Sequence, residues 1–198
     1  MSEVIKIANC SGFYGDNLSI AKKMVEGGPI DVLTGDYLAE LTMTILYNQK
    51  MKRGENLGYV GTFLKQFRDV AKLCNDQNIK IVSNAGGLNP ASMAAEVENI
   101  IKELNLDLKV AYIDGDDLMP RLDELSSSGE KLKNIDKNND LFSYEKKPLT
   151  ANAYLGAWGI KEALDNGADV VICPRVTDAA VVIGPAAWKF NWSRNDYD

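Results

Sequence analysis

Histidine is absent from the 198-residue sequence. A Ser-His-Asp triad, a Cys-His pair and any histidine-liganded metal site are therefore excluded within this chain, and proton transfer must use carboxylates, lysine, tyrosine, cysteine or water. Cysteine occurs three times, as Cys10, Cys74 and Cys173, at wide spacing and without a C-x-x-C pair. This pattern indicates neither a disulfide framework nor a zinc site, and we expect a reducing, cytoplasmic location.

Positive charge is also in short supply. Lys and Arg number 22 against 28 Asp and Glu, which gives a formal net charge of −6. Nucleic-acid binding needs a basic surface, so we expect no nucleic-acid partner. No apolar run approaches the roughly 18 residues of a membrane span, and the first residues lack the basic-then-apolar order of a signal peptide. We therefore expect no membrane partner either.

Short apolar runs alternate with segments of helical periodicity along the whole chain. Strands are predicted at 4–8, 30–34, 79–83, 108–113 and 169–173. Continuous apolar strands that alternate with helices are typical of βαβ units. The sequence therefore predicts an α/β fold, with a mostly parallel central sheet flanked by helices in a Rossmann-like, three-layer arrangement, and a single domain over residues 1–198.

Three local features refine this prediction. Asp36 stands where it could cap the helix after the second strand, and Asn152 where it could cap a helix over 152–164. Pro90 suits the first turn of a helix. The stretch 126–146 is polar and rich in serine, lysine and asparagine, so we expect a mobile insertion there.

Each predicted strand ends at a turn that combines glycine with asparagine, aspartate or arginine. Because parallel strands share one carboxyl edge, we expect these turns to converge there, where α/β proteins place ligand sites. The alternative is that these are ordinary turn and cap residues, which is the simpler interpretation of each turn alone. The turns lie at 9–16, 35–36, 84–89, 114–117 and 175–178.

Two of these turns are candidates for anion binding, because glycine lets backbone N–H groups approach an anion at the start of a helix. Gly12 and Asp16 belong to the first, which has neither the G-x-G-x-x-G nor the Walker spacing. A tight turn followed by a helix cap is the alternative for the second, and physics alone favours it. The second turn is the better cradle and contains Asn84, Gly86, Gly87 and Asn89.

Charged residues in the last two turns offer further chemistry. Asp114, Asp116 and Asp117 could bind a hard cation such as Mg²⁺, but we favour a solvated acidic cap and predict no metal. Arg175 is the one cation expected among the turns, and its guanidinium could bind a carboxylate or phosphate in bidentate fashion. A salt bridge from Arg175 to Asp178 is the equal alternative.

Several longer blocks carry a family resemblance. They span residues 9–16, 31–40, 83–90, 151–157, 167–178 and 184–188, which distributes the resemblance over nearly the whole chain. These blocks resemble the acyclic terpene utilisation family, the AtuA-like proteins, although the family has glycine where this chain has Pro174. The family core continues further, so the resemblance implies the N-terminal part of a longer core or a natural short form.

The family is tied to the breakdown of citronellol- and geraniol-type compounds through branched acyl-CoA thioesters. The resemblance therefore implies an enzyme, or part of one, whose ligand is an acyl-CoA or a branched carboxylate. The CoA moiety of such a substrate is the one cofactor-like group that the resemblance implies. Within the matching blocks, chemistry favours Arg175 as the partner of an anionic group. Asp36 or Asp178 would be the general base, and Tyr37 an acid.

A non-catalytic assembly subunit of the same family is the alternative. The lack of histidine and of a recognisable nucleophile favours it. Trp188 and Trp192 could then form a contact between subunits, since aromatic residues are enriched at such anchors, although tryptophans more often serve plain packing. In either case we expect a homo-oligomer.

Overall fold

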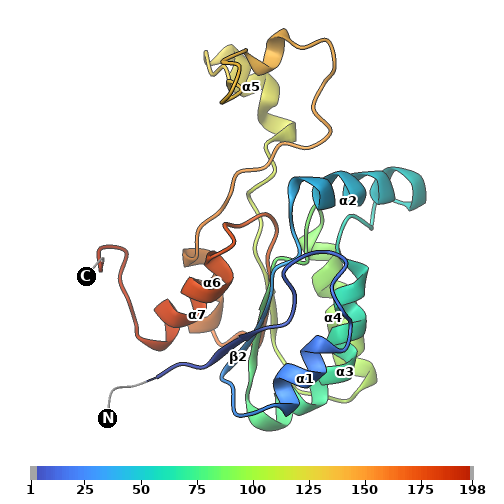
Figure 1. Ribbon diagram of the computed structural model, residues 1–198, viewed down its shortest axis with the longest axis vertical. Coiled ribbons are helices and arrows are strands. Elements are labelled where there is room, and N and C mark those ends of the chain that lie inside the picture. Colours follow the sequence, from blue (N-terminus) through green and yellow to red (C-terminus); the bar gives the residue numbers. More distant parts are fainter. Residues whose placement is uncertain (1–3, 197–198) are drawn as a thin grey trace.

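A central sheet of five parallel strands organises the computed structural model, which describes residues 4–196 (Figure 1). The strands are β1 (Ile7–Asn9), β2 (Val32–Gly35), β3 (Lys80–Ser83), β4 (Val110–Tyr112) and β5 (Val170–Ile172), in the order β1-β2-β3-β5-β4. The helices are α1 (Ile20–Glu26), α2 (Glu40–Arg53), α3 (Gly61–Gln77), α4 (Pro90–Glu103), α5 (Leu122–Ser127), α6 (Trp158–Asp165) and α7 (Ala180–Lys189). The predicted α/β fold is confirmed.

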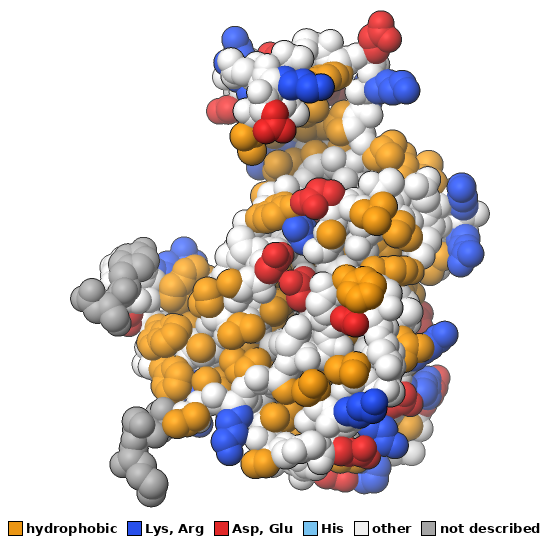
Figure 2. Space-filling model, viewed as in Figure 1, with side chains coloured by type: hydrophobic (Ala, Val, Ile, Leu, Met, Phe, Trp, Pro, Cys, Tyr) orange, Lys and Arg blue, Asp and Glu red, His pale blue; other side chains and the backbone are white. Residues whose placement is uncertain are grey.

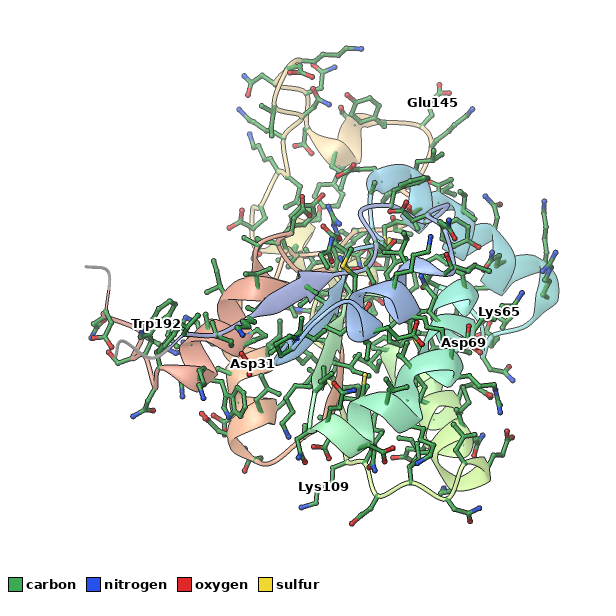
Figure 3. The ribbon with its side chains drawn as sticks, turned by 60° about the horizontal axis from the view of Figure 1, so that its bottom comes forward. Asp31, Lys65, Asp69, Lys109, Glu145 and Trp192 are labelled. Carbon is green, nitrogen blue, oxygen red and sulfur yellow. The ribbon has the colours of Figure 1, made fainter. Side chains whose placement is uncertain are left out.

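Helices cover both faces of this sheet, because successive strand residues point to opposite sides. Leu33 and Ile81 pack on the side of α1, α3 and α4, whereas Val82 and Val171 pack on the side of α6 and α7. Figure 3 shows the result: Lys65 and Asp69 of α3 lie on one side of the sheet, and Trp192 lies on the other. None of the described helices is both long and apolar enough to cross a bilayer.

The chain changes direction across the sheet between β3 and β5. β3 is followed by α4 on one face, whereas its neighbour β5 is followed by α7 on the other face. The helices that follow these two adjacent strands therefore leave the carboxyl edge on opposite faces. Such a topological switch point leaves a crevice where open α/β sheets bind ligands.

Two predicted helix starts are wrong. α2 begins at Glu40 with Ala39 as its N-cap, so Asp36 is free of any capping role. The predicted helix over 152–164 begins only at Trp158. The residues before it are extended, because Ala153 N donates to the Asp116 carbonyl and Leu155 N donates to the Arg175 carbonyl. These long-range pairings outweigh the local helical periodicity. Pro90, in contrast, does open α4 as predicted.

The polar stretch after β4 projects from the body (Figure 1). It contains α5 and two short 3₁₀ turns, at Met119–Arg121 and Leu141–Ser143, and no residue from 118 to 150 is buried. Figure 3 places Glu145 on this projection, away from the sheet. A segment that buries so little apolar surface contributes little to the core, which agrees with its polar sequence; its mobility stays a prediction.

Candidate functional site

The turns at the carboxyl edge are joined to one another by hydrogen bonds. Asp36 N donates to the Ser11 carbonyl at 2.9 Å, which joins the turns after β1 and β2. Gly86 N donates to the Cys173 carbonyl at 3.0 Å, which joins the turns after β3 and β5. Asp116 accepts from Arg175 N at 3.2 Å and adds the turn after β4. The predicted convergence of the turns is confirmed.

Arg175 occupies the switch point. Its residue is 5% exposed, and its Nη1 donates to the Leu38 carbonyl at 2.7 Å. That is the one hydrogen bond its guanidinium makes to the described residues, although Asp178 lies 3.8 Å from Nη1. The salt bridge to Asp178 considered from the sequence is thus present at long range. A guanidinium has five N–H donors, so most of the donor capacity of Arg175 remains for a ligand.

Two residues that the sequence did not single out complete the surroundings of Arg175. The Tyr154 ring lies under the guanidinium, with 4.1 Å between its centroid and Cζ, in a cation–π contact. The Tyr154 hydroxyl donates to Glu40 Oε1, which lowers the pKa of that carboxyl. The same oxygen is 3.8 Å from Arg175 Nη2. Glu40 and Tyr154 lie in blocks of the family resemblance, and that was the signal that could have found them.

Asp36 is held beside this group by Asn84. Asn84 is fully buried, and its side chain donates to Asp36 Oδ1 at 2.5 Å while accepting from Tyr37 N at 2.8 Å. Partial burial raises the pKa of the Asp36 carboxyl, and the negative charge of Asp178 raises it further, whereas Asn84 and Arg175 act in the opposite direction. Figure 2 shows acidic side chains close together near the middle of this face.

A groove of about 320 Å³ opens beside Arg175. One wall comes from the start of α2 and the other from the extended residues after the projection. The groove therefore joins the switch point to the outside, and both charged and apolar side chains line it. It is lined by Glu40, Met43, Thr44, Leu149, Thr150, Asn152, Tyr154 and Arg175.

Comparison with known protein families identifies this chain. The model for the acyclic terpene utilisation family protein AtuA matches residues 5–198. The chain belongs to the AtuA family. Neither the curated proteins nor the solved structures contain a significant match.

In this AtuA-family chain the turn after β3 serves packing. Its N–H groups donate to acceptors within the protein: Gly86 to the Cys173 carbonyl, Gly87 to the Asn84 carbonyl and Asn89 to the Gly86 carbonyl. The Asn89 side chain accepts from Ser92 N as the cap of α4. These amides are thus already satisfied, and the turn fits the alternative interpretation of a tight turn with a helix cap.

The loop after β1 is also closed by its own residues. Asp16 Oδ2 accepts from Gly12 N at 2.8 Å, so a carboxylate stands where the backbone would meet an anion. A bound phosphate would have to displace that negative charge. The loop therefore offers no better anion site than the turn after β3, and both Gly12 and Asp16 have structural partners.

Tyr37 contributes its backbone N–H to the site, whereas its phenol lies elsewhere. The Tyr37 hydroxyl is buried and donates to Gln66 Oε1 at 2.5 Å, with Cys10 Sγ 3.8 Å away. Burial raises the pKa of this phenol far above its ordinary value. The structure thus places the hydroxyl in the core, remote from the groove in which an acid would act.

Asp116 differs from the expected solvated cap, and that interpretation is wrong for this residue. It is 5% exposed, and its Oδ2 accepts from Asn152 Nδ2 at 2.8 Å as well as from Arg175 N. Burial raises the pKa of its carboxyl. Asp116 thereby holds the turn after β5 against the extended residues that bring Tyr154 under Arg175. Asp114 and Asp117 remain exposed.

Proposed function

We propose that this chain forms the ligand-binding and catalytic site of an enzyme of acyclic terpene breakdown, whose substrate is a branched carboxylate or its acyl-CoA thioester. The observation that carries the proposal is the buried Arg175 at the switch point, stacked on Tyr154 and open to the groove. Family membership supports the metabolic setting. An arginine with unused donors is suited to a carboxylate or to a thioester carbonyl that develops negative charge.

Asp36 is the proposed general base. A carboxylate with a raised pKa is a stronger base once it is ionised, and burial next to Asp178 produces such a shift here. Asn84 fixes Oδ1 of Asp36, and the backbone N–H of Leu38 also donates to this carboxyl. The proton from the ligand would go to a lone pair that these two hydrogen bonds leave free. Asp178 is exposed beside Arg175 and acts on Asp36 through its charge.

The test is binding and turnover of branched acyclic carboxylic acids and their CoA thioesters. We expect Arg175→Lys to weaken binding by about tenfold or more, since lysine loses the planar fork and the stacking. We expect Asp36→Asn to bind normally and to lose turnover. Arg68→Lys is the matched control, because Arg68 pairs with Glu103 on the surface of α3 and α4. Normal binding and turnover in both site variants would refute the proposal.

A second candidate function is an assembly subunit that pairs with another copy of itself. Figure 2 shows hydrophobic side chains gathered over the side of the molecule that α6 and α7 occupy. Val182 and Ile183 of α7 are 42% and 46% exposed, and Trp192 is 40% exposed. Because α7 carries apolar residues on its exposed side as well as its buried side, this surface favours a partner. Light scattering would show a dimer that Ile183→Lys converts to a monomer, while Met24→Lys on α1 leaves it intact.

A further inference from the structure

The groove at Arg175 continues along α2. A second hollow of about 250 Å³ adjoins it, and the two share Leu149 and Thr150 in their walls. α2 lines both hollows, from Glu40 in the first to Met51 in the second. Eleven helical steps at 1.5 Å each make this path about 16 Å long. A single elongated ligand could therefore occupy both hollows.

Charged groups gather around Arg175 in the first hollow, and apolar side chains line both hollows. Arg175, Tyr154 and Glu40 contact one another in the first hollow. The apolar side chains are mostly flexible thioethers, which adapt to irregular aliphatic chains. Lys50, Glu55 and Asp117 bring charges of both signs to the second hollow, so this hollow selects neither anionic nor cationic groups. The apolar lining consists of Met43, Leu149, Met51, Leu88 and Met119.

Glu40 shows how Tyr154 and Arg175 hold a carboxylate. The hydroxyl of Tyr154 donates to Glu40 Oε1, and Arg175 Nη2 faces the same oxygen at 3.8 Å. The Glu40 side chain is 83% exposed, so it can move aside without disturbing the core. A ligand carboxylate in its place would meet the same hydroxyl and could approach the guanidinium directly. Glu40 is then an internal competitor for that position.

We infer that the ligand is a free aliphatic carboxylate, whose head group replaces Glu40 at Tyr154 and Arg175 and whose chain lies along α2 toward Met51. The inference rests on the proposed function and narrows its substrate to the free acid. It assigns the specificity for chain length to Met51 and Leu149. A CoA thioester lacks the carboxylate and carries a large polar group, so it fits this arrangement less well.

Calorimetric titration with straight-chain carboxylates from butanoate to dodecanoate, below their micellar concentrations, tests the inference. We expect affinity to rise about two- to fourfold per added methylene, the upper value being about 0.8 kcal/mol per buried CH₂, and to level off once the chain passes Met51. Met51 and Leu149 are 63% and 48% exposed, so serine at either position spares the core. Both variants should flatten the rise with chain length, so the ratio of dodecanoate affinity to butanoate affinity should fall. Met24→Ser, on α1 and 38% exposed, is the matched control.

Glu40→Gln provides an independent measurement on an exposed residue. It removes the competing charge, so we expect carboxylates of every length to bind several-fold more tightly than to the natural chain. The inference is overturned if affinity is independent of chain length, or if the CoA thioester of a branched acid binds more tightly than the acid itself. Either result leaves the proposed function standing as long as Arg175→Lys weakens binding. Failure of every carboxylate and thioester to bind would instead overturn the proposed function.

Discussion

Gly86 lies where the turns after β3 and β5 touch, and replacing it with alanine tests the geometry of the whole site. The added methyl group would stand 2.6 Å from the Cys173 carbonyl oxygen and 2.8 Å from Pro90 Cβ. One is backbone and the other a ring, so neither can rotate away. Overpacking of this kind costs about 1–3 kcal/mol. Weakening of the 3.0 Å hydrogen bond from Gly86 N to the Cys173 carbonyl in the variant would add about 0.5–1.5 kcal/mol.

The expected destabilisation by Gly86→Ala is therefore about 2–4 kcal/mol. For a chain of this size each kcal/mol lowers Tm by about 2–4 °C, so thermal unfolding followed by circular dichroism should show a fall of about 5–15 °C. Gly61→Ala is the control, because a methyl group there meets nothing within 4 Å at the start of α3. Equal Tm values for the two variants would mean that the turns after β3 and β5 are not in contact. The placement of Arg175 at the switch point would then be refuted.

Two further predictions concern Asp36 and Tyr37. The pKa of Asp36 is raised in the folded protein, so the native carboxyl holds a proton more tightly than the unfolded chain does. The free energy of unfolding should therefore fall as pH rises from the ordinary pKa of aspartate through the raised pKa of Asp36. Asp36→Asn should remove this fall and be the more stable protein at pH 7, as urea unfolding at several pH values would reveal. Tyr37→Phe leaves Gln66 Oε1 without its donor and should lower the free energy of unfolding by about 1–3 kcal/mol. Carboxylate binding should persist in this variant. Loss of activity at unchanged stability would contradict the structural role of the Tyr37 hydroxyl.

The architecture of the sheet could be predicted because its strands are short apolar runs with little ambiguity. Val170, Val171 and Ile172 are all buried, so the run needs both faces covered and indicates an inner strand of a parallel sheet. The segment after Asn152 was mispredicted for the opposite reason. Its conformation depends on Asp116 and Arg175, which lie far away in the sequence, and local periodicity carries no information about them.

The site could be predicted in part for a related reason. Polar residues after parallel strands must share one edge, which places Asp36 and Arg175 on the same edge without knowledge of the strand order. Glu40 and Tyr154 could not be found in this way, because they follow the edge by several residues and meet only through the path of the chain after the projection.

Position after a strand does not distinguish polar groups that hold the turns together from polar groups that face a ligand. Asn84 and Asp116 are chemically as suited to a ligand as Arg175 is, and all three are buried. Asn84 uses its amide on Tyr37 N and Asp36, and Asp116 uses Oδ2 on Asn152 and Arg175 N. Arg175 alone among the three has more donors than protein acceptors within reach. Which residue retains unused donors depends on distances across three turns, and that is why the sequence alone could not single out Arg175.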